Sequence, residues 1–182
     1  MTENKHKVKI LLTEEQINKR IMEVSLQIQR DFLDKDPLII SILKGSFIFS
    51  SDLIRHLNPL YKIDFIVAKS YVGTESSGSV KIIADVKSDI KGKDILFIDD
   101  IADTGVTTSF LRKEFLKRGA KSVKVCVLLN KQSRRLVDTT IEYCCFDIPN
   151  EFVVGYGLDY NDLYRGLPYI GILSQENKEM TI

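Results

Sequence analysis

The sequence predicts an α/β fold in which a mainly parallel sheet is doubly wound, with helices packed on its faces. Short apolar runs, typical of strands buried on both faces, alternate along the chain with stretches of helical periodicity. The segment 94–129 also has the order and length of one right-handed βαβ unit. In such a sheet, ligands bind at the carboxyl ends of the strands, so side chains that follow strands are the first candidates for a functional site.

The first third of the chain contains two predicted helices and one predicted strand. Thr13 and Gln16 have the spacing of a capping box, and four apolar residues follow at helical spacing: Ile17, Ile21, Val24 and Ile28. This pattern predicts a helix over about 13–31. A buried strand is predicted at 38–43, and a second helix over about 46–57 ends before a proline.

The remaining elements alternate between strands and one further helix. Strands are predicted near 62–69 and 80–85, separated by the polar, glycine-bearing segment 71–79. Such a segment is usually a solvated hairpin loop, and a mobile lid is the functional alternative. A helix over about 106–118 lies between strands 94–100 and 122–129. Shorter strands complete the chain at 142–146, 152–156 and 169–173.

The composition indicates one compact domain spanning 1–182. Hydrophobic residues make up 44% of the chain, and the net charge of +1 gives no reason to expect a nucleic acid or a membrane as a partner. The N-terminal segment is polar and the apolar runs are short, so we expect a cytoplasmic protein. Three cysteines and two histidines favour packed, reduced thiols over a disulfide framework or a zinc site.

The most informative segment joins the predicted strand 94–100 to the helix after it. Asp99 and Asp100 end an apolar run, Asp103 follows, and a Thr-Gly turn leads into the helix. Paired carboxylates are typical of an acid/base pair, a metal site or a diol clamp, although acids also favour helix starts. The free N–H groups of a helix N-terminus favour an anion. A phosphorylated sugar, with a phosphate at one end and hydroxyls at the other, suits both features.

Residues 95–108 resemble the phosphoribosyl-pyrophosphate signature of the type I phosphoribosyltransferases. Further segments, in the same order along the chain, are similar to the hypoxanthine (hypoxanthine-guanine) branch of that family: 43–45, 69–71, 129–131 and 152–161 with Arg165. The resemblance implies the type I fold, with a small hood formed by the terminal segments. It also implies a purine-salvage enzyme that uses phosphoribosyl pyrophosphate and an oxopurine base, requires Mg²⁺, and forms a homo-oligomer, either a dimer or a tetramer.

The resemblance assigns a role to each matching residue. Asp99 and Asp100 would bind the ribose hydroxyls, and Asp103 would be the catalytic base at purine N7. The 5-phosphate would lie on the turn that begins the helix, made by Asp103, Thr104, Gly105, Val106, Thr107 and Thr108. The purine would contact Lys131, Phe152, Val153 and Asp159, and pyrophosphate would contact Lys44, Gly45, Ser70, Tyr71 and Arg165. Mg²⁺ would bind Asp159, Asp99 and Asp100.

Three details refine the comparison with the family. Asp99 stands where relatives often carry Glu, so its carboxylate is one methylene closer to the backbone. Val106 stands where some relatives carry Lys, which removes one phosphate partner. In this family the peptide bond before the residue matching Lys44 is often cis, although no proline is present.

Other interpretations of the same residues stay open. Lys131 begins the basic run 131–135, which composition alone assigns to a solvated surface, and an aromatic such as Phe152 is more often a core residue than a stacking platform. A receiver domain is disfavoured because its acidic pair closes the first strand, whereas several strands precede Asp100 here. The main functional alternative is a regulator that binds phosphoribosyl pyrophosphate without catalysis.

Overall fold

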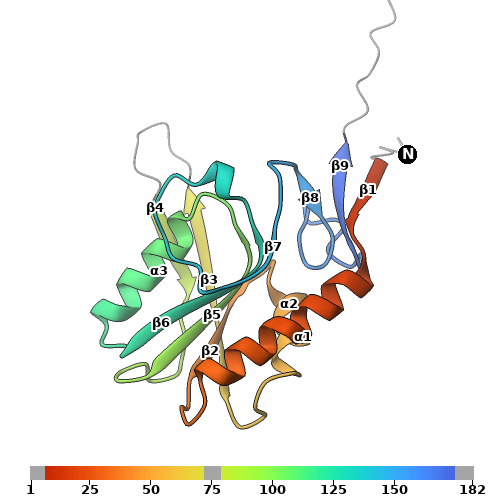
Figure 1. Ribbon diagram of the computed structural model, residues 1–182. Helices are drawn as coiled ribbons and strands as arrows, with labels where there is room; N and C mark the ends of the chain where they lie inside the picture. Colours follow the sequence, from red (N-terminus) through yellow and green to blue (C-terminus); the bar gives the residue numbers. More distant parts are fainter. Residues whose placement is uncertain (1–6, 72–78, 175–182) are drawn as a thin grey trace, which may run out of the picture.

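The computed structural model describes residues 7–71 and 79–174, which form two sheets (Figure 1). The larger sheet has the strand order β4-β3-β2-β5-β6-β7. Its strands are β2 (Leu38–Leu43), β3 (Lys62–Tyr71), β4 (Ser79–Ala84), β5 (Asp94–Ala102), β6 (Ser122–Asn130) and β7 (Tyr143–Asp147). All neighbouring strands run parallel except β3 and β4. The predicted mainly parallel sheet is therefore confirmed.

Helices cover both faces of this sheet (Figure 1). Helices α1 (Glu14–Asp31) and α2 (Phe47–Ile54) pack on one face, and α3 (Val106–Lys117) packs on the other. Along β5, Leu96 and Ile98 join the core of α1 and α2, while Ile95 and Phe97 join the core of α3. Because successive side chains of a strand point to opposite faces, a strand buried on both sides needs this continuous apolar run.

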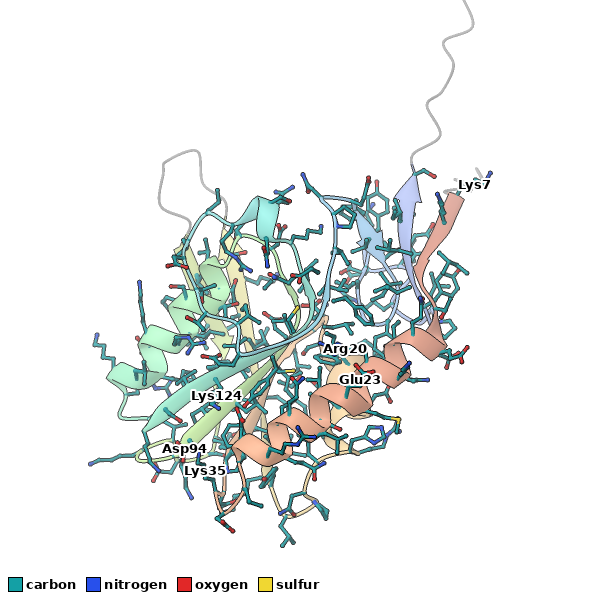
Figure 2. The ribbon with its side chains drawn as sticks, viewed as in Figure 1. Lys7, Arg20, Glu23, Lys35, Asp94 and Lys124 are labelled. Atoms are coloured by element: carbon teal, nitrogen blue, oxygen red, sulfur yellow. The ribbon has the colours of Figure 1, made fainter. Side chains whose placement is uncertain are left out.

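Helix α1 is held to the sheet by its apolar face and by one arginine. The predicted capping box is present: Thr13 Oγ1 accepts a hydrogen bond from Gln16 N at 3.3 Å, and Gln16 Oε1 accepts one from Thr13 N at 2.9 Å. Arg20, shown in Figure 2, donates to the Cys145 and Cys144 carbonyls at 2.8 and 3.0 Å and pairs with Glu23. These bonds tie α1 to the edge strand β7.

The smaller sheet is antiparallel and has the order β1-β9-β8. It contains β1 (Lys7–Leu12), β9 (Ile170–Ser174) and β8 (Val153–Val154), so the segments near the two ends of the described chain lie side by side (Figure 1). This is the hood that the family resemblance implies, although strand β1 was not itself predicted. Val153 and Ile170 belong to the same core cluster as α1, which joins the hood to the larger sheet.

Several predicted boundaries differ from those observed. Helix α2 ends at Ile54 rather than near 57. Strand β8 is only two residues long because the chain turns with positive φ at Gly155 (97°) and Tyr156 (49°). Strand β5 continues to Ala102, two residues beyond the predicted end at 100.

Two further predictions concern the segment 71–79 and the membrane. The question of a loop or a lid at 71–79 falls on residues 72–78, which lie outside the described residues. Among the helices of the described ranges, none is long and apolar enough to cross a membrane.

Candidate active site

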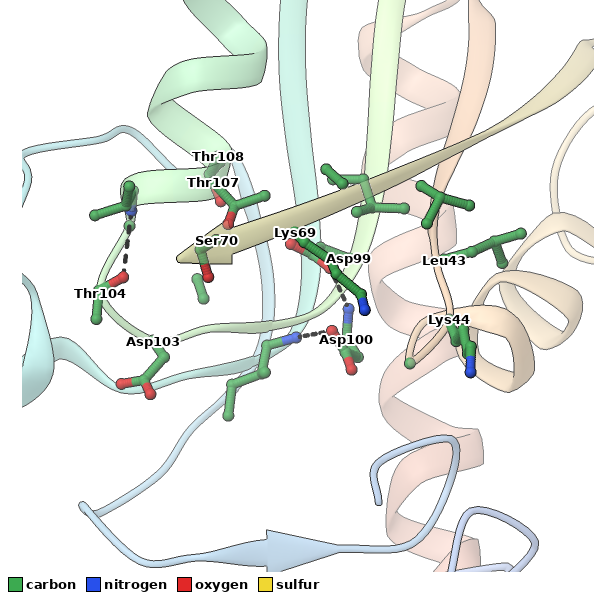
Figure 3. Close-up of a pocket in the computed structure, with 18 of the residues that line it drawn as sticks. Leu43, Lys44, Lys69, Ser70, Asp99, Asp100, Asp103, Thr104, Thr107 and Thr108 are labelled. Atoms are coloured by element: carbon green, nitrogen blue, oxygen red, sulfur yellow. Dashed lines mark hydrogen bonds between the residues drawn. The ribbon is translucent and has the colours of Figure 1, made fainter. Parts of the chain in front are cut away.

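A cavity of about 760 Å³ opens where β2, β3 and β5 end (Figure 3). Most of the predicted site residues line it: Lys44, Gly45, Ser70, Asp99, Asp100, Asp103, Thr104, Gly105, Val106, Thr107, Thr108, Asp159 and Arg165. Parallel strands bring their carboxyl ends to one edge of a sheet, which is why segments far apart in the sequence meet here. Lys131, Phe152 and Val153 are not part of this lining, and the side chain of Tyr71 is not described.

The acidic pair lies at the end of the central strand β5. Asp99 is 7% exposed, and its Oδ1 accepts a hydrogen bond from Asp100 N at 3.0 Å. Asp100 Oδ1 accepts one from Ile101 N at 2.9 Å. Burial and the adjacent Asp100 carboxylate raise the pKa of Asp99 well above its usual range, and burial also raises the pKa of Asp100. A buried acid beside a half-buried one, with few internal donors to either, is poised to accept hydrogen bonds from a diol or to bind a cation.

Gly45 packs directly on the acidic pair. A Cβ added at Gly45 would lie 1.6 Å from Asp100 Oδ2, so only a glycine fits between this turn and the carboxylate. The peptide bond between Leu43 and Lys44 is cis, as the family resemblance implies. A Cβ at Gly157 would lie 2.0 Å from the Gly45 carbonyl oxygen. The Lys44-Gly45 turn therefore touches both the acidic pair and the segment that follows β8.

Arg165 organises that segment from within the cavity wall. It donates to the Gly157 carbonyl at 2.8 Å, pairs with Asp159 Oδ1 at 2.7 Å, and contacts Asp162 at 3.2 Å. On the other side, the Tyr156 hydroxyl donates to the Asp52 carboxylate of α2. The Arg165 contacts hold the 155–165 segment together, and the Tyr156 bond joins this segment to α2.

The Thr-Gly turn leads directly into α3. Gly105 has φ 80°, a conformation that favours glycine, and it is the residue before the first helical turn. Gly105 has no side chain to cap the helix, and Thr104 Oγ1 accepts a long hydrogen bond from Val106 N at 3.4 Å. Val106, Thr107 and Thr108 line the cavity (Figure 3). The backbone N–H groups and partial positive charge of this N-terminus therefore face a space that an anion can fill.

Asp103 lies between two cationic side chains of the 131–135 segment. Arg134 Nε pairs with Asp103 Oδ1 at 2.9 Å. Lys131 is 7% exposed, so the interpretation as a solvated lysine is wrong. Burial lowers the pKa of Lys131, and the Asp103 carboxylate acts in the opposite direction. Arg134 was not among the predicted site residues, because no local pattern in the sequence indicates its ion pair with Asp103.

Two predicted purine contacts lie in the hood. Val153 is buried in β8, and Phe152 beside it is 53% exposed. The Phe152 ring meets the ring of Tyr160 edge to face, with centroids 5.7 Å apart. Phe152 is therefore a surface aromatic and not a core residue.

The carboxylates of the cavity have the chemistry that Mg²⁺ accepts. The ion takes oxygen ligands, and it is commonly bound by one or two carboxylates together with substrate phosphates. Asp99, Asp100 and Asp159 line the same cavity and supply such oxygens. Within the described ranges, no group of three His, Cys, Asp or Glu side chains is arranged to hold a metal by itself. The donor set fits an ion that arrives with a phosphorylated substrate.

A doubly wound sheet with buried acids and an open helix N-terminus at its carboxyl edge defines an α/β protein that binds a phosphorylated ligand. A model of the phosphoribosyl transferase domain matches residues 7–161. The chain belongs to the phosphoribosyltransferase family. It is 48% identical over 177 residues to a hypoxanthine-guanine phosphoribosyltransferase of Streptococcus agalactiae, covering 97% of this chain and 98% of the relative. The match to the corresponding Streptococcus thermophilus protein is 46% over 169 residues, or 92% and 94% of the two chains.

Solved structures agree with this assignment. A hypoxanthine-guanine phosphoribosyltransferase from Bacillus anthracis superposes with a TM-score of 0.86 at 43% identity, covering 93% of this chain and 99% of the other. A hypoxanthine phosphoribosyltransferase from Staphylococcus aureus gives a TM-score of 0.87 at 45% identity over 91% of each chain. The predicted family and fold class are therefore confirmed.

We expect Gly45→Ala to disable the site, because its Cβ would displace the Asp100 carboxylate. Since displacing a reacting group by about 1 Å can cost roughly 100-fold in rate, we expect a loss of at least that order in phosphoribosyl transfer. Gly166→Ala is the matched control, because a Cβ there meets nothing within 4 Å. Steady-state kinetics measure both variants, and near-normal activity in Gly45→Ala would contradict the packing described here.

We expect Asp99→Asn to stabilise the unliganded protein at neutral and higher pH. A raised folded-state pKa lowers stability as pH rises from the unfolded-state pKa through the folded-state pKa. The gain is therefore largest above the folded-state pKa and disappears below the unfolded-state pKa. Denaturant unfolding at several pH values measures it.

Asp94→Asn, on the same strand, provides a control of opposite sign. Burial opposes ionisation of Asp94, but hydrogen bonds from Ser122 and Lys121 outweigh it and lower the pKa of Asp94. Its ionised form stabilises the fold above the unfolded-state pKa, and this contribution is lost as pH falls through the folded-state pKa. We therefore expect Asp94→Asn to destabilise the protein at neutral pH and to have little effect in acid. Destabilisation by Asp99→Asn at neutral or higher pH would contradict the cost of burying the ionised Asp99 carboxylate.

Proposed function

We propose that this protein transfers the 5-phosphoribosyl group from phosphoribosyl pyrophosphate to N9 of hypoxanthine, and also of guanine, in purine salvage. The products are the nucleotide, IMP or GMP, and pyrophosphate. The observation that carries the proposal is that one cavity contains the acidic pair Asp99 and Asp100 and the N-terminus of α3. The relatives that cover nearly the whole chain are named hypoxanthine-guanine phosphoribosyltransferases.

The sugar phosphate is bound by two neighbouring parts of the chain in this proposal. The 5-phosphate accepts hydrogen bonds from the backbone N–H groups and the threonine hydroxyls of the turn 103–108. The ribose hydroxyls donate to Asp99 and Asp100, whose burial makes an incoming donor more valuable than it would be in water. Because the ribose is bound at both of these subsites, its C1 atom is oriented toward the base.

The purine lies between Asp103 and the hood. N9 attacks C1 as the bond from C1 to the pyrophosphate oxygen breaks, and pyrophosphate leaves with the electron pair. Asp103 takes the N7 proton of the base, and the Lys131 ammonium donates to the 6-oxo oxygen. The Phe152 ring stacks on the purine, for which its exposure is suited, while the Val153 backbone and Asp159 meet the edge of the base.

Pyrophosphate leaves on the side of the Lys44-Gly45 turn. Lys44 is 71% exposed at the cavity rim, and Gly45, Ser70 and Arg165 line the wall. Arginine suits a polyphosphate because its planar guanidinium offers paired donors. Tyr71, which belongs to β3 by its backbone, is proposed to act with Ser70. Mg²⁺, held by Asp159, Asp99 and Asp100, would neutralise charge on the departing pyrophosphate.

The assay that tests this proposal follows nucleotide formation from hypoxanthine, phosphoribosyl pyrophosphate and Mg²⁺. Asp103→Asn should lower kcat by about 10²–10⁴-fold, the usual contribution of a general base, with little change in the KM for phosphoribosyl pyrophosphate. Asp36→Asn is the control and should behave as wild type, because Asp36 lies just before β2, at the end of that strand away from the cavity.

Lys131→Ala separates the base contact from the sugar-phosphate contact. It should raise the KM for hypoxanthine more than the KM for phosphoribosyl pyrophosphate, because only the base meets this ammonium group. Binding of phosphoribosyl pyrophosphate without turnover of any oxopurine would refute the proposal and would favour a regulator of the same fold. Near wild-type turnover in Asp103→Asn would refute the role of Asp103 alone.

We further propose a homo-oligomer, either a dimer or a tetramer. The support is an exposed apolar group on β3 and β4, with Ile63, Phe65 and Ile83 exposed by 43%, 51% and 51%. Exposed apolar side chains that gather on one sheet edge are typical of an interface. Light scattering should give a mass of two or four times the 20.8 kDa of one chain, and a monomeric mass would contradict the proposal.

The cytoplasm is the proposed compartment. The three cysteines of the chain are free, and Cys126 and Cys145 are buried. Burial raises the pKa of Cys145 to about 12, so this thiol stays protonated and unreactive. Free thiols of this kind suit a reducing compartment.

A further inference from the structure

The carboxylate proposed as the catalytic base is already engaged by an arginine that the mechanism above does not use. Arg134 Nε and Asp103 Oδ1 lie 2.9 Å apart, and both side chains line the cavity. Asp103 Oδ1 is buried and accepts no hydrogen bond from the described residues, so the adjacent guanidinium charge is what favours one orientation of the carboxylate. The side chains are 48% and 37% exposed, so the pair contributes little to the stability of the fold.

The position of Arg134 follows from the short helix after β6. This helix, η1 (Gln132–Arg134), is a 3-10 turn that begins after Lys131, and Arg134 N donates to the Lys131 carbonyl at 3.1 Å. Side chains three residues apart lie on the same side of such a turn. Lys131, which precedes η1, and Arg134, which ends it, therefore both interact with Asp103, so two positive charges act on one carboxylate.

The backbone around η1 is bonded to the turn that carries Asp103. Lys131 N donates to the Ala102 carbonyl at 3.0 Å. Leu136 N and Val137 N both donate to the Thr104 carbonyl, at 3.0 and 3.2 Å. These bonds lie on either side of Asp103 in the sequence. The distance between Arg134 and the carboxylate is thus determined by two bonded backbone segments, and the contact is not a chance meeting of two flexible side chains.

The neighbouring arginine is directed elsewhere. Arg135 donates to the Asn130 side chain, and its Cδ packs where a Cβ on Gly105 would lie. Asn130 is in turn bonded to Asp147 at 2.7 Å. Of the two adjacent arginines, only Arg134 has its ion pair with the proposed base.

We propose that Arg134 is a positioning residue for Asp103. The inference rests on the proposed function, because it assigns Arg134 a role in the step that Asp103 performs. Arg134 holds Oδ1, and since a carboxylate accepts at both oxygens, Oδ2 can receive the N7 proton of the purine. Arg134 itself touches neither the base nor the reacting carbon. It acts by limiting the carboxylate to the orientation that meets N7. Lys131 determines where N7 lies, because it binds the 6-oxo group of the same base.

A double-mutant cycle tests this role. Arg134→Gln should lower kcat about tenfold, because a base left free to rotate spends less time in the reactive geometry. The KM for phosphoribosyl pyrophosphate should change less than about twofold, since the sugar-phosphate contacts are untouched. In an Asp103→Asn background, Arg134→Gln should have almost no further effect, because two residues that act in one step are not additive.

Two further variants make the result specific. Arg134→Lys keeps the charge but loses the planar donor, so we expect it to recover part of the activity that Arg134→Gln loses. Arg118→Gln removes a similar ion pair, with Asp85 at 3.0 Å, away from the cavity and should behave as wild type. Thermal unfolding should be unchanged in all single variants at Arg134.

The outcomes separate this inference from the proposed function. An active wild type with a non-additive cycle supports both. If the wild type is active but the losses of Arg134→Gln and Asp103→Asn simply multiply, or if Arg134→Gln turns over normally, the positioning role is wrong and the proposed function stands. A wild type that turns over no oxopurine refutes the proposed function and this inference with it.

Discussion

Two adjacent carboxylates of a central strand, Asp99 buried and Asp100 half-buried, are the constraint on which the rest of the structure depends. Strand β5 lies between β2 and β6 and is covered on both faces, so Asp99 enters the protein almost as deeply as the apolar residues before it. Burial of two adjacent acids raises the free energy of the unliganded protein, because ionised carboxylates lose their hydration there. The extensive apolar cores on either side of the strand stabilise the fold and offset this cost.

The segments around the pair are adapted to it by close packing. A side chain at Gly45 would collide with the Asp100 carboxylate, and a side chain at Gly157 would collide with the Gly45 carbonyl. Arg165 bonds to the Gly157 carbonyl and to Asp159, and Tyr156 bonds to Asp52 on the helix that follows the Lys44-Gly45 turn. The proposed pyrophosphate and purine subsites therefore share one bonded unit, so a displacement at one subsite moves the other.

The acidic residues of the cavity lie in two different environments, which correspond to their proposed roles. The acidic pair is deep and has few donors, whereas Asp103 is partly exposed and lies among cations supplied by the 131–135 segment. Carboxylates in these two environments suit different chemistry, since the first pair has few hydrogen-bond donors and Asp103 lies beside the Arg134 guanidinium. The open N-terminus of α3 between them supplies the positive potential that a phosphate needs.

Local patterns in the sequence determined much of the fold and the composition of the site. The capping box at Thr13, the apolar run of β5, and the helix after Gly105 depend on neighbouring residues only, and each was predicted correctly. Strand β1 was missed because it becomes a strand by pairing with β9 at the far end of the chain. Likewise, nothing near Lys131 or Arg134 in the sequence indicates a buried ammonium or an ion pair with Asp103. The sequence determined which chemical groups are present and which elements carry them. Only the tertiary structure decided which groups meet, because pairing, burial and ion-pair geometry depend on segments that are distant along the chain.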